Sequence, residues 1–202
     1  MLKDRSFVGR SLARSQALQL LFQAELRDRS VEDVLTQGPC LEKGPLDDFG
    51  RELALGVEDS LRELDTIISA RSAAWPVERM PLVDRNLLRI AIYEMLYVKE
   101  VDIAVAIDEC VELAKAYGTD ETPRFVNGIL GRVADQLEAG EDPVELSRAE
   151  LTSRKASSVS GFGWESEVSA NEVGDADAMD AQTDVEGCEG TDRDVVTSGG
   201  EL

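Results

Sequence analysis

The sequence predicts an all-α fold, a compact bundle of about six to seven helices followed by a disordered acidic C-terminal tail. From Arg10 to the high 130s, apolar residues recur at spacings of three and four, and no run of alternating β-branched residues marks a strand. The composition changes about two-thirds of the way along the 202 residues. We therefore expect one helical domain over residues 10–139, a flexible N-terminus over 1–9 and the tail over 140–202.

The first half of the domain contains three predicted helices. One covers about residues 10–27, and a short one follows through Gln37 with Ser30 as its N-cap. The stretch GPCLEKGP predicts a loop. Apolar residues spaced by three and four then predict one long helix over about 46–73. The stretch WPVERMP ends it, because each Pro disfavours helix in the residue before it.

Three further helices complete the domain. The helix over about 82–98 is apolar nearly all round, which predicts a central position. Asp102 as N-cap and Gly118 at the C-terminal end delimit a helix over about 103–117. The last helix begins with Thr122 as N-cap and Pro123 in its first turn.

The last helix contains Asn127-Gly128, a dipeptide that between apolar runs usually signals a hairpin. The apolar residues around it nevertheless fall on one half of a wheel with about 100° per residue, so the helix is favoured. Gly128 and Gly131 then lie on the polar half and leave a bare patch of backbone. Either an external partner or a neighbouring helix of the same fold approaches this patch.

Most of the acidity lies in the tail. From Glu138 onward there are 17 acidic and 4 basic residues, which gives −13 of the total formal charge of −20. The segment is poor in large apolar residues and cannot offset the entropy of ordering, so residues 140–202 are expected to be disordered. Two roles stay open for the tail: a solubilising segment, or a shield that covers a basic face.

The sequence excludes several classes of function. The chain has no histidine, which removes Ser-His-Asp and Cys-His catalysis and histidine zinc sites. Neither GxxxxGK[ST] nor a GxGxxG after a strand occurs. Cys40, Cys110 and Cys188 have unrelated spacings, which suggest neither a disulfide framework nor a metal site. No apolar leader occurs, and no apolar window is long enough to span a membrane. We expect a cytoplasmic protein that is not an enzyme and uses no metal or other cofactor.

Three stretches resemble the NusB family of transcription antitermination factors: RSLARSQALQLLFQAEL, LVDRNLLRIAIYEML and VAIDECVELAKAYGTDETPRFVNGILGRV. The resemblance covers about Arg10 to Leu137. It implies two packed helical subdomains without catalysis. It also implies binding of boxA-type single-stranded RNA of ribosomal RNA transcripts together with NusE, a small-subunit ribosomal protein, in a complex with other Nus factors on elongating RNA polymerase. The alternative is a homodimeric helical regulator or an RNA-binding accessory domain without an antitermination role.

The resemblance also implies two sets of site residues. The RNA-binding set is Arg10, Arg14, Glu121, Arg124, Phe125 and Asn127. The NusE-binding set is Asp84, Arg89, Tyr93 and Glu94.

Several of these residues also have ordinary structural interpretations. Phe125 lies at the edge of the apolar stripe and is either a base-stacking platform or core, and Asn127 either reads base edges or holds a loop. Arg89 lies in the most apolar helix, so it pairs with a carboxylate, Asp84 or Glu94, or contacts the partner.

The N-terminus carries fewer cations than is usual for the family. Lys3, Arg5, Arg10 and Arg14 against Asp4 give a net charge of only +3. Because phosphate contacts supply a salt-dependent part of the affinity, we expect weak binding to RNA alone and stronger binding with NusE.

Overall fold

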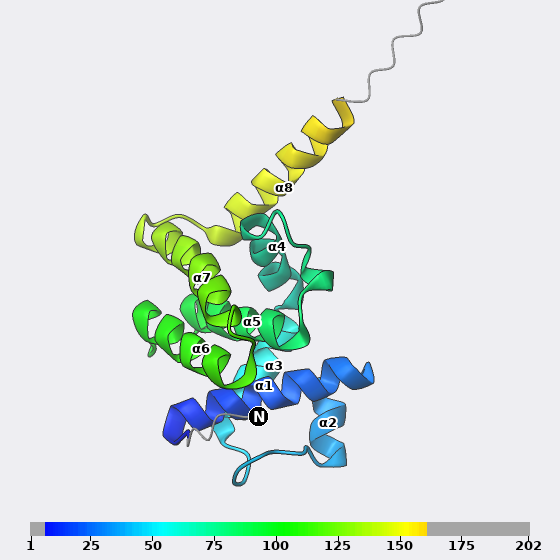
Figure 1. Cartoon of the computed structure of the whole chain (residues 1–202), viewed down its shortest axis with the longest axis vertical. Helices are drawn as coiled ribbons and strands as arrows, with labels where there is room; N and C mark the ends of the chain where they lie inside the picture. The colour runs from blue at the N-terminus through cyan, green and yellow to red at the C-terminus, as the bar shows by residue number, and fades with distance from the viewer. Residues whose placement is uncertain (1–6, 161–202) are drawn as a thin grey trace, which may run out of the picture. The chain divides into compact units, whose positions relative to one another are not determined.

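The computed structural model describes residues 7–160, and within them the chain is entirely helical apart from its connections. The all-α prediction is confirmed, with eight α-helices in this range instead of six to seven (Figure 1). The elements are α1 (Gly9–Arg27), α2 (Val31–Gln37), α3 (Asp48–Asp59), α4 (Leu61–Arg71), the 3-10 turn η1 (Val77–Arg79), α5 (Leu82–Tyr97), α6 (Ile103–Tyr117), α7 (Thr122–Glu138) and α8 (Pro143–Ser160).

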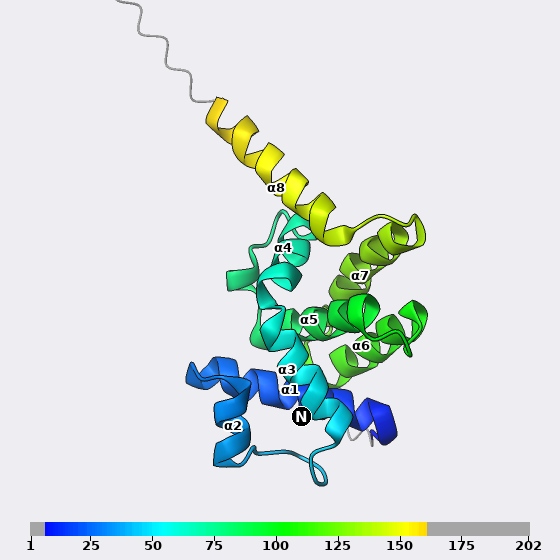
Figure 2. The same ribbon diagram turned by 180° about the vertical axis from the view of Figure 1, so that it is seen from behind.

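The helices form two groups around one hydrophobic core. Helices α1, α2 and α3 pack on one another, α4 to α7 form the second group, and α5 touches helices of both (Figures 1 and 2). The two groups correspond to the two packed subdomains that the family resemblance implies. The central position predicted for α5 is confirmed. The largest fully buried apolar side chains are Leu20, Leu53, Leu64, Ile67, Ile68, Leu87, Leu88, Ile90, Ile92, Leu113 and Leu130.

The single helix predicted over 46–73 is wrong, because the chain bends at Ser60 and forms α3 and α4. Ser60 has φ −101° and ψ 7°, and its N–H donates to the carbonyls of Gly56 and Val57. The bend lets α3 pack along α1 while α4 packs against α5 and α8. Apolar residues keep their spacing through the bend, since both halves bury a face, and periodicity alone therefore does not reveal it.

The predicted helix ends are mostly correct. Ser30 caps α2 by accepting from the Asp33 N–H at 3.0 Å. Asp102 precedes α6 but makes no side-chain capping bond. Gly118 ends α6 with φ −91°, a backbone conformation that does not itself require glycine. Glycine is needed there because a Cβ would lie only 2.6 Å from the Thr122 side chain. Thr122 itself is the first residue of α7 and Glu121 takes the N-cap position, one residue earlier than predicted.

The predicted disorder of residues 140–202 is wrong for residues 143–160, which form α8. Asp142 caps this helix by accepting from the N–H groups of Val144 and Glu145 at 2.8 and 3.2 Å. Pro143 is buried and Val144 packs on the core. The stretch 143–160 holds three basic and two acidic residues, so the strong acidity that suggested disorder lies beyond it. Residues 1–6 and 161–202 lie outside the described residues, and the predictions for them stay predictions.

Candidate functional site

A cleft of about 720 Å³ lies between the loop that follows α4 and the first half of α7. Three arginines and one glutamate line it, so its wall carries a net positive charge. Its lining residues are Arg71, Ser72, Ala73, Ala74, Trp75, Glu121, Arg124, Phe125, Gly128, Ile129 and Arg132.

An aromatic pair forms part of the cleft wall. The rings of Trp75 and Phe125 have centroids 5.1 Å apart at an interplanar angle of 52°. Trp75 is 37% exposed, whereas Phe125 is partly buried and packs against the core. Phe125 thus serves as core and lines the cleft at once, so its two sequence interpretations are compatible.

The loop that carries Trp75 is tightly held. The Ser72 hydroxyl donates to the carbonyls of Ile68 and Trp75 at 2.8 and 3.0 Å, and the Trp75 N–H donates to the Ser72 carbonyl at 2.8 Å. The sequence patterns did not identify Trp75 as a site residue. The available signal is a large aromatic residue in a Pro-broken connection, where no helix face can bury it.

The cations of the cleft come from α4 and α7. Arg124 is exposed and forms no ion pair or hydrogen bond from its side chain within residues 7–160. Arg132 donates from Nε to the Gly128 carbonyl at 3.2 Å. Arg124, Gly128 and Arg132 follow one another at spacings of four, which aligns them on one helix face. That spacing is the signal by which Arg132 could have been found.

The polar face of α7 is open. A Cβ built on Gly128 or on Gly131 would meet no atom within 4 Å. The alternative in which a neighbouring helix of the fold covers these glycines is therefore excluded for the described residues. Glu121 and Arg124 share the cleft with Gly128, whereas the exposed Asn127 does not line it.

The two arginines at the start of α1 lie outside the cleft and differ from each other. Both guanidinium groups lie over the Phe49 ring, at 5.0 Å for Arg10 and 5.8 Å for Arg14. Arg10 is exposed. Arg14 is buried and forms a bidentate ion pair with Glu94, with Nε to Oε2 at 2.9 Å and Nη2 to Oε1 at 2.8 Å. Arg10 is therefore accessible from solvent while Arg14 braces the fold, and an RNA contact of either residue stays a prediction.

Glu94 and Asp84, two residues of the expected NusE-binding set, are also buried. Burial raises the pKa of Glu94 above the ordinary value, although the Arg14 hydrogen bond opposes this. Asp84 accepts a hydrogen bond at 3.0 Å from the Thr122 hydroxyl in α7, and burial raises the pKa of Asp84 as well. Both carboxylates join α5 to other helices instead of facing solvent.

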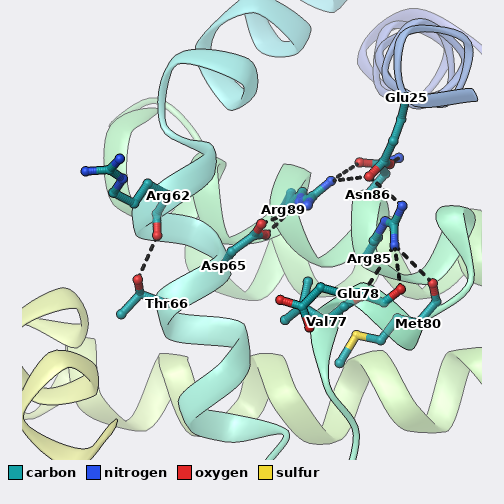
Figure 3. A network of polar contacts seen from close by, with 10 residues as sticks. All are labelled: Glu25, Arg62, Asp65, Thr66, Val77, Glu78, Met80, Arg85, Asn86 and Arg89. Atoms are coloured by element: carbon teal, nitrogen blue, oxygen red, sulfur yellow. Dashed lines mark hydrogen bonds and ion pairs between the residues drawn. The ribbon is translucent and has the colours of Figure 1, made fainter. Parts of the chain in front are cut away.

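Arg89 lies at the centre of a polar network between α1, α4 and α5 (Figure 3). Its Nε and Nη2 donate to the Asp65 carboxylate at 2.7 and 2.9 Å, and its Nη1 donates to Asn86 at 3.0 Å and to Glu25 at 3.3 Å. The expected pairing with Asp84 or Glu94 is wrong. The actual partners lie 24 and 64 residues away, and no local spacing reveals them.

Glu25 is held by several donors of this network. Arg85 pairs with it at 2.6 Å, and Asn86 donates to it at 2.9 Å. Burial alone would raise the pKa of Glu25, but the hydrogen bond from Arg85, the charge of Arg89 and the hydrogen bond from Asn86 together lower it below the ordinary 4.5. The network therefore stabilises a charged carboxylate between helices.

Tyr93 is the one member of the expected NusE-binding set that is not fully buried. Its ring packs against Gly56, where a Cβ would overlap it, and lies 5.1 Å from the ring of the exposed Tyr97. Asp84, Arg89 and Glu94 therefore act as internal braces of α5, and a direct contact of any of the four residues with NusE stays a prediction.

Within residues 7–160, no helix combines the length and apolar character needed to span a bilayer. No cluster of three or more metal-ligating side chains occurs among the same residues.

Comparison with known proteins agrees with this architecture. The NusB family profile matches residues 11–135. The transcription antitermination protein NusB of Salinispora arenicola is 50% identical over 130 residues, which cover 63% of this chain and 96% of that protein. NusB of Carboxydothermus hydrogenoformans is 41% identical over 138 residues, covering 65% and 96%.

Solved structures show the same fold. NusB of T. maritima superimposes with a TM-score of 0.56 at 37% identity, over 65% of this chain and 94% of that one. A NusB chain from a crystal structure of the antitermination factors NusB and NusE in complex with dsRNA gives a TM-score of 0.52 at 24% identity, over 61% and 94%. With the helix order, the central α5 and the match over residues 11–135, these similarities show that the chain belongs to the NusB family.

Proposed function

We propose that this chain is a transcription antitermination factor that binds boxA-type single-stranded RNA of ribosomal RNA transcripts together with NusE, within a complex on elongating RNA polymerase. The observation that carries the proposal is the cleft in which Trp75 and Phe125 lie beside the unpaired Arg124. Curated relatives that share up to half of the aligned residues are named transcription antitermination proteins, and one solved structure of the same fold is described as NusB and NusE in complex with dsRNA.

The chemistry of the cleft suits an unpaired RNA strand. An exposed aromatic ring can stack on a base, and such stacking contributes about 1–3 kcal/mol per base. Arg124 and Arg132 supply charge for phosphates, and arginine can also stack on unpaired bases. The open backbone at Gly128 leaves room for the strand to approach α7 closely. Binding of this kind requires no catalytic group, so we propose a role without catalysis.

NusE is the proposed protein partner. The exposed Tyr97 and the partly buried Tyr93 are neighbouring rings at the C-terminal end of α5, and a second protein can reach them. Aromatic residues are enriched at protein interfaces. Asp84, Arg89 and Glu94 contribute to such a surface indirectly, because they hold α5 in its position.

The test is a polarisation titration of the full chain with a labelled boxA-type single-stranded RNA, with and without NusE. We expect NusE to tighten binding. Trp75→Ala should weaken binding by about fivefold to a hundredfold, the effect of losing one stacked base. Arg124→Ala should weaken binding and reduce the slope of log affinity against log salt by about 0.7, the value for one phosphate of a single strand.

Arg62→Ala is the matched control, since Arg62 is an exposed arginine of α4 that does not line the cleft. A duplex RNA of the same sequence shows whether the cleft prefers single strands. An Arg62→Ala effect as large as that of Arg124→Ala would contradict the assignment of the cleft. Absence of binding by the unaltered protein, with and without NusE, would overturn the proposed function.

A further inference from the structure

Helix α8 lies beyond the segment that matches the NusB family profile, yet it packs along α4 and pairs with one of the arginines that line the cleft. Glu150 of α8 pairs with Arg71 of α4, with Oε1 and Nη2 2.9 Å apart. Arg154 donates from Nη2 to the Ala70 carbonyl at 3.1 Å. The helix therefore holds the C-terminal end of α4 at two consecutive residues.

Arg71 is one of the three arginines that line the cleft, and it is the one that an acidic group neutralises. Its side chain is 12% exposed, and its Nε is buried without a hydrogen-bond partner within the described residues. An unpaired buried donor costs free energy, so the guanidinium has hydrogen-bonding capacity that Glu150 does not use. A backbone phosphate carries the same single negative charge as a carboxylate and can take the place of Glu150 on this guanidinium.

We propose that Glu150 is an internal competitor for the nucleic-acid cleft. In the free protein its carboxylate occupies Arg71, and a bound RNA strand must exchange this carboxylate for a phosphate before Arg71 contributes. This inference rests on the proposed function of the cleft. Helix α8, which lies outside the family match, thus lowers the affinity of the cleft for RNA through the ion pair between Glu150 and Arg71.

The competition arises from charge at short range. A carboxylate 2.9 Å from Arg71 cancels most of the attraction that this arginine exerts on a phosphate. It also repels any phosphate that enters the same part of the cleft. Arg124, which has no such partner in the described part of the chain, contributes its full charge from the start.

The experiment compares Glu150→Gln with the unaltered chain in the same RNA titration. Gln keeps the length of the side chain and an oxygen acceptor but removes the charge. We expect RNA binding roughly two- to tenfold tighter, as for removal of one weak ion-pair competitor. The salt slope should steepen by about 0.7, because one more phosphate contact forms.

Two further variants make the result specific. Glu145→Gln removes the same charge from the same helix, but Glu145 is exposed and pairs at 3.9 Å with Arg148, away from the cleft. It should leave RNA affinity unchanged. Arg71→Ala should abolish the gain in salt slope in the Glu150→Gln background, because the additional phosphate contact is made by Arg71. Circular dichroism melts of each variant confirm that the fold is retained.

The outcomes separate this inference from the proposed function. Equal RNA affinities for Glu150→Gln and Glu145→Gln overturn the competitor role while the cleft keeps its function. A gain in salt slope that persists in full when Glu150→Gln is combined with Arg71→Ala also overturns it, since Arg71 would then not make the additional phosphate contact. Absence of RNA binding by every variant and by the unaltered chain overturns the proposed function itself.

Discussion

The Arg14 guanidinium and the Glu94 carboxylate form a bidentate ion pair that joins α1 to α5 across 80 residues of sequence. Their side chains are 3% and 1% exposed. Removal of one partner of such a pair leaves a buried charge without compensation and costs about 3–5 kcal/mol.

Arg14→Ala should therefore lower the free energy of unfolding by about 3–5 kcal/mol, measured by urea denaturation. Arg10→Ala is the control on the same helix. It removes an exposed arginine over the same Phe49 ring and should cost at most about 1 kcal/mol. Similar losses in the two variants would contradict the internal role of Arg14. Arg10→Ala is also the cleaner test of an RNA contact at the start of α1, because it leaves the fold intact.

Gly128→Ala and Gly131→Ala should each raise the free energy of unfolding by roughly 0.5–1 kcal/mol, since alanine favours helix more than glycine does. Neither new methyl group would meet an atom within 4 Å. The two variants should differ in RNA titrations, because only Gly128 lines the cleft. We expect weaker RNA binding for Gly128→Ala and no change for Gly131→Ala. Loss of stability in both would show that the polar face of α7 is covered in solution.

Gly50→Ala should destabilise the protein by about 1–3 kcal/mol, as overpacking of a tight contact does. Its Cβ would lie 2.6 Å from the Ala13 carbonyl oxygen, which belongs to the backbone of α1 and cannot rotate away. The stabilising Gly131→Ala change is the control for helix propensity. A melting temperature for Gly50→Ala at or above that of the unaltered protein would contradict the close approach of α1 and α3.

The ion pairs of Glu25 predict a specific loss of stability in acid. The pKa of Glu25 in the folded chain lies below its ordinary value of 4.5, so its contribution is fully present above pH 4.5 and is lost as the pH falls toward the folded value. Glu25→Gln should reduce stability at pH 7, and the difference from the unaltered protein should shrink below pH 4.5. Asp84 and Glu94, whose pKa values are raised, act in the opposite direction and are common to both proteins. Urea titrations at several pH values measure the difference, and a constant difference from pH 7 to 3 would contradict the role of Glu25.

The fold could be predicted largely because most helices bury one face. The apolar character of the 82–98 segment correctly predicted the central helix α5, and Ser30 correctly predicted the start of α2. The bend at Ser60 escaped prediction because α3 and α4 bury faces against different neighbours while keeping the same spacing. Helix α8 was not predicted because the composition of its residues was considered together with that of a far more acidic segment.

The candidate site was only partly accessible from sequence. Family resemblance brought Glu121, Arg124 and Phe125 together, and the cleft indeed contains all three. Trp75 and Arg71 join them from a loop and a helix about 50 residues earlier, and only the packing of α4 beside α7 creates that proximity. Arg14 and Glu94 were assigned to partner surfaces because charge usually marks the surface, whereas here they are buried partners of each other on two helices. Arg89 was expected to need a carboxylate, but its partner Asp65 lies on α4 and no local spacing identifies it.

The polar braces of α5 also set an order for folding during synthesis. Glu94 follows Arg14 by 80 residues, so at roughly 5–20 residues per second it is made about 4–16 s later. Over that interval α1 has helix propensity but no counter-charge for its interior arginine. We expect the nascent α1 to pack on α2 and α3 first, and its buried arginine to gain a counter-charge only after α5 has emerged from the ribosome.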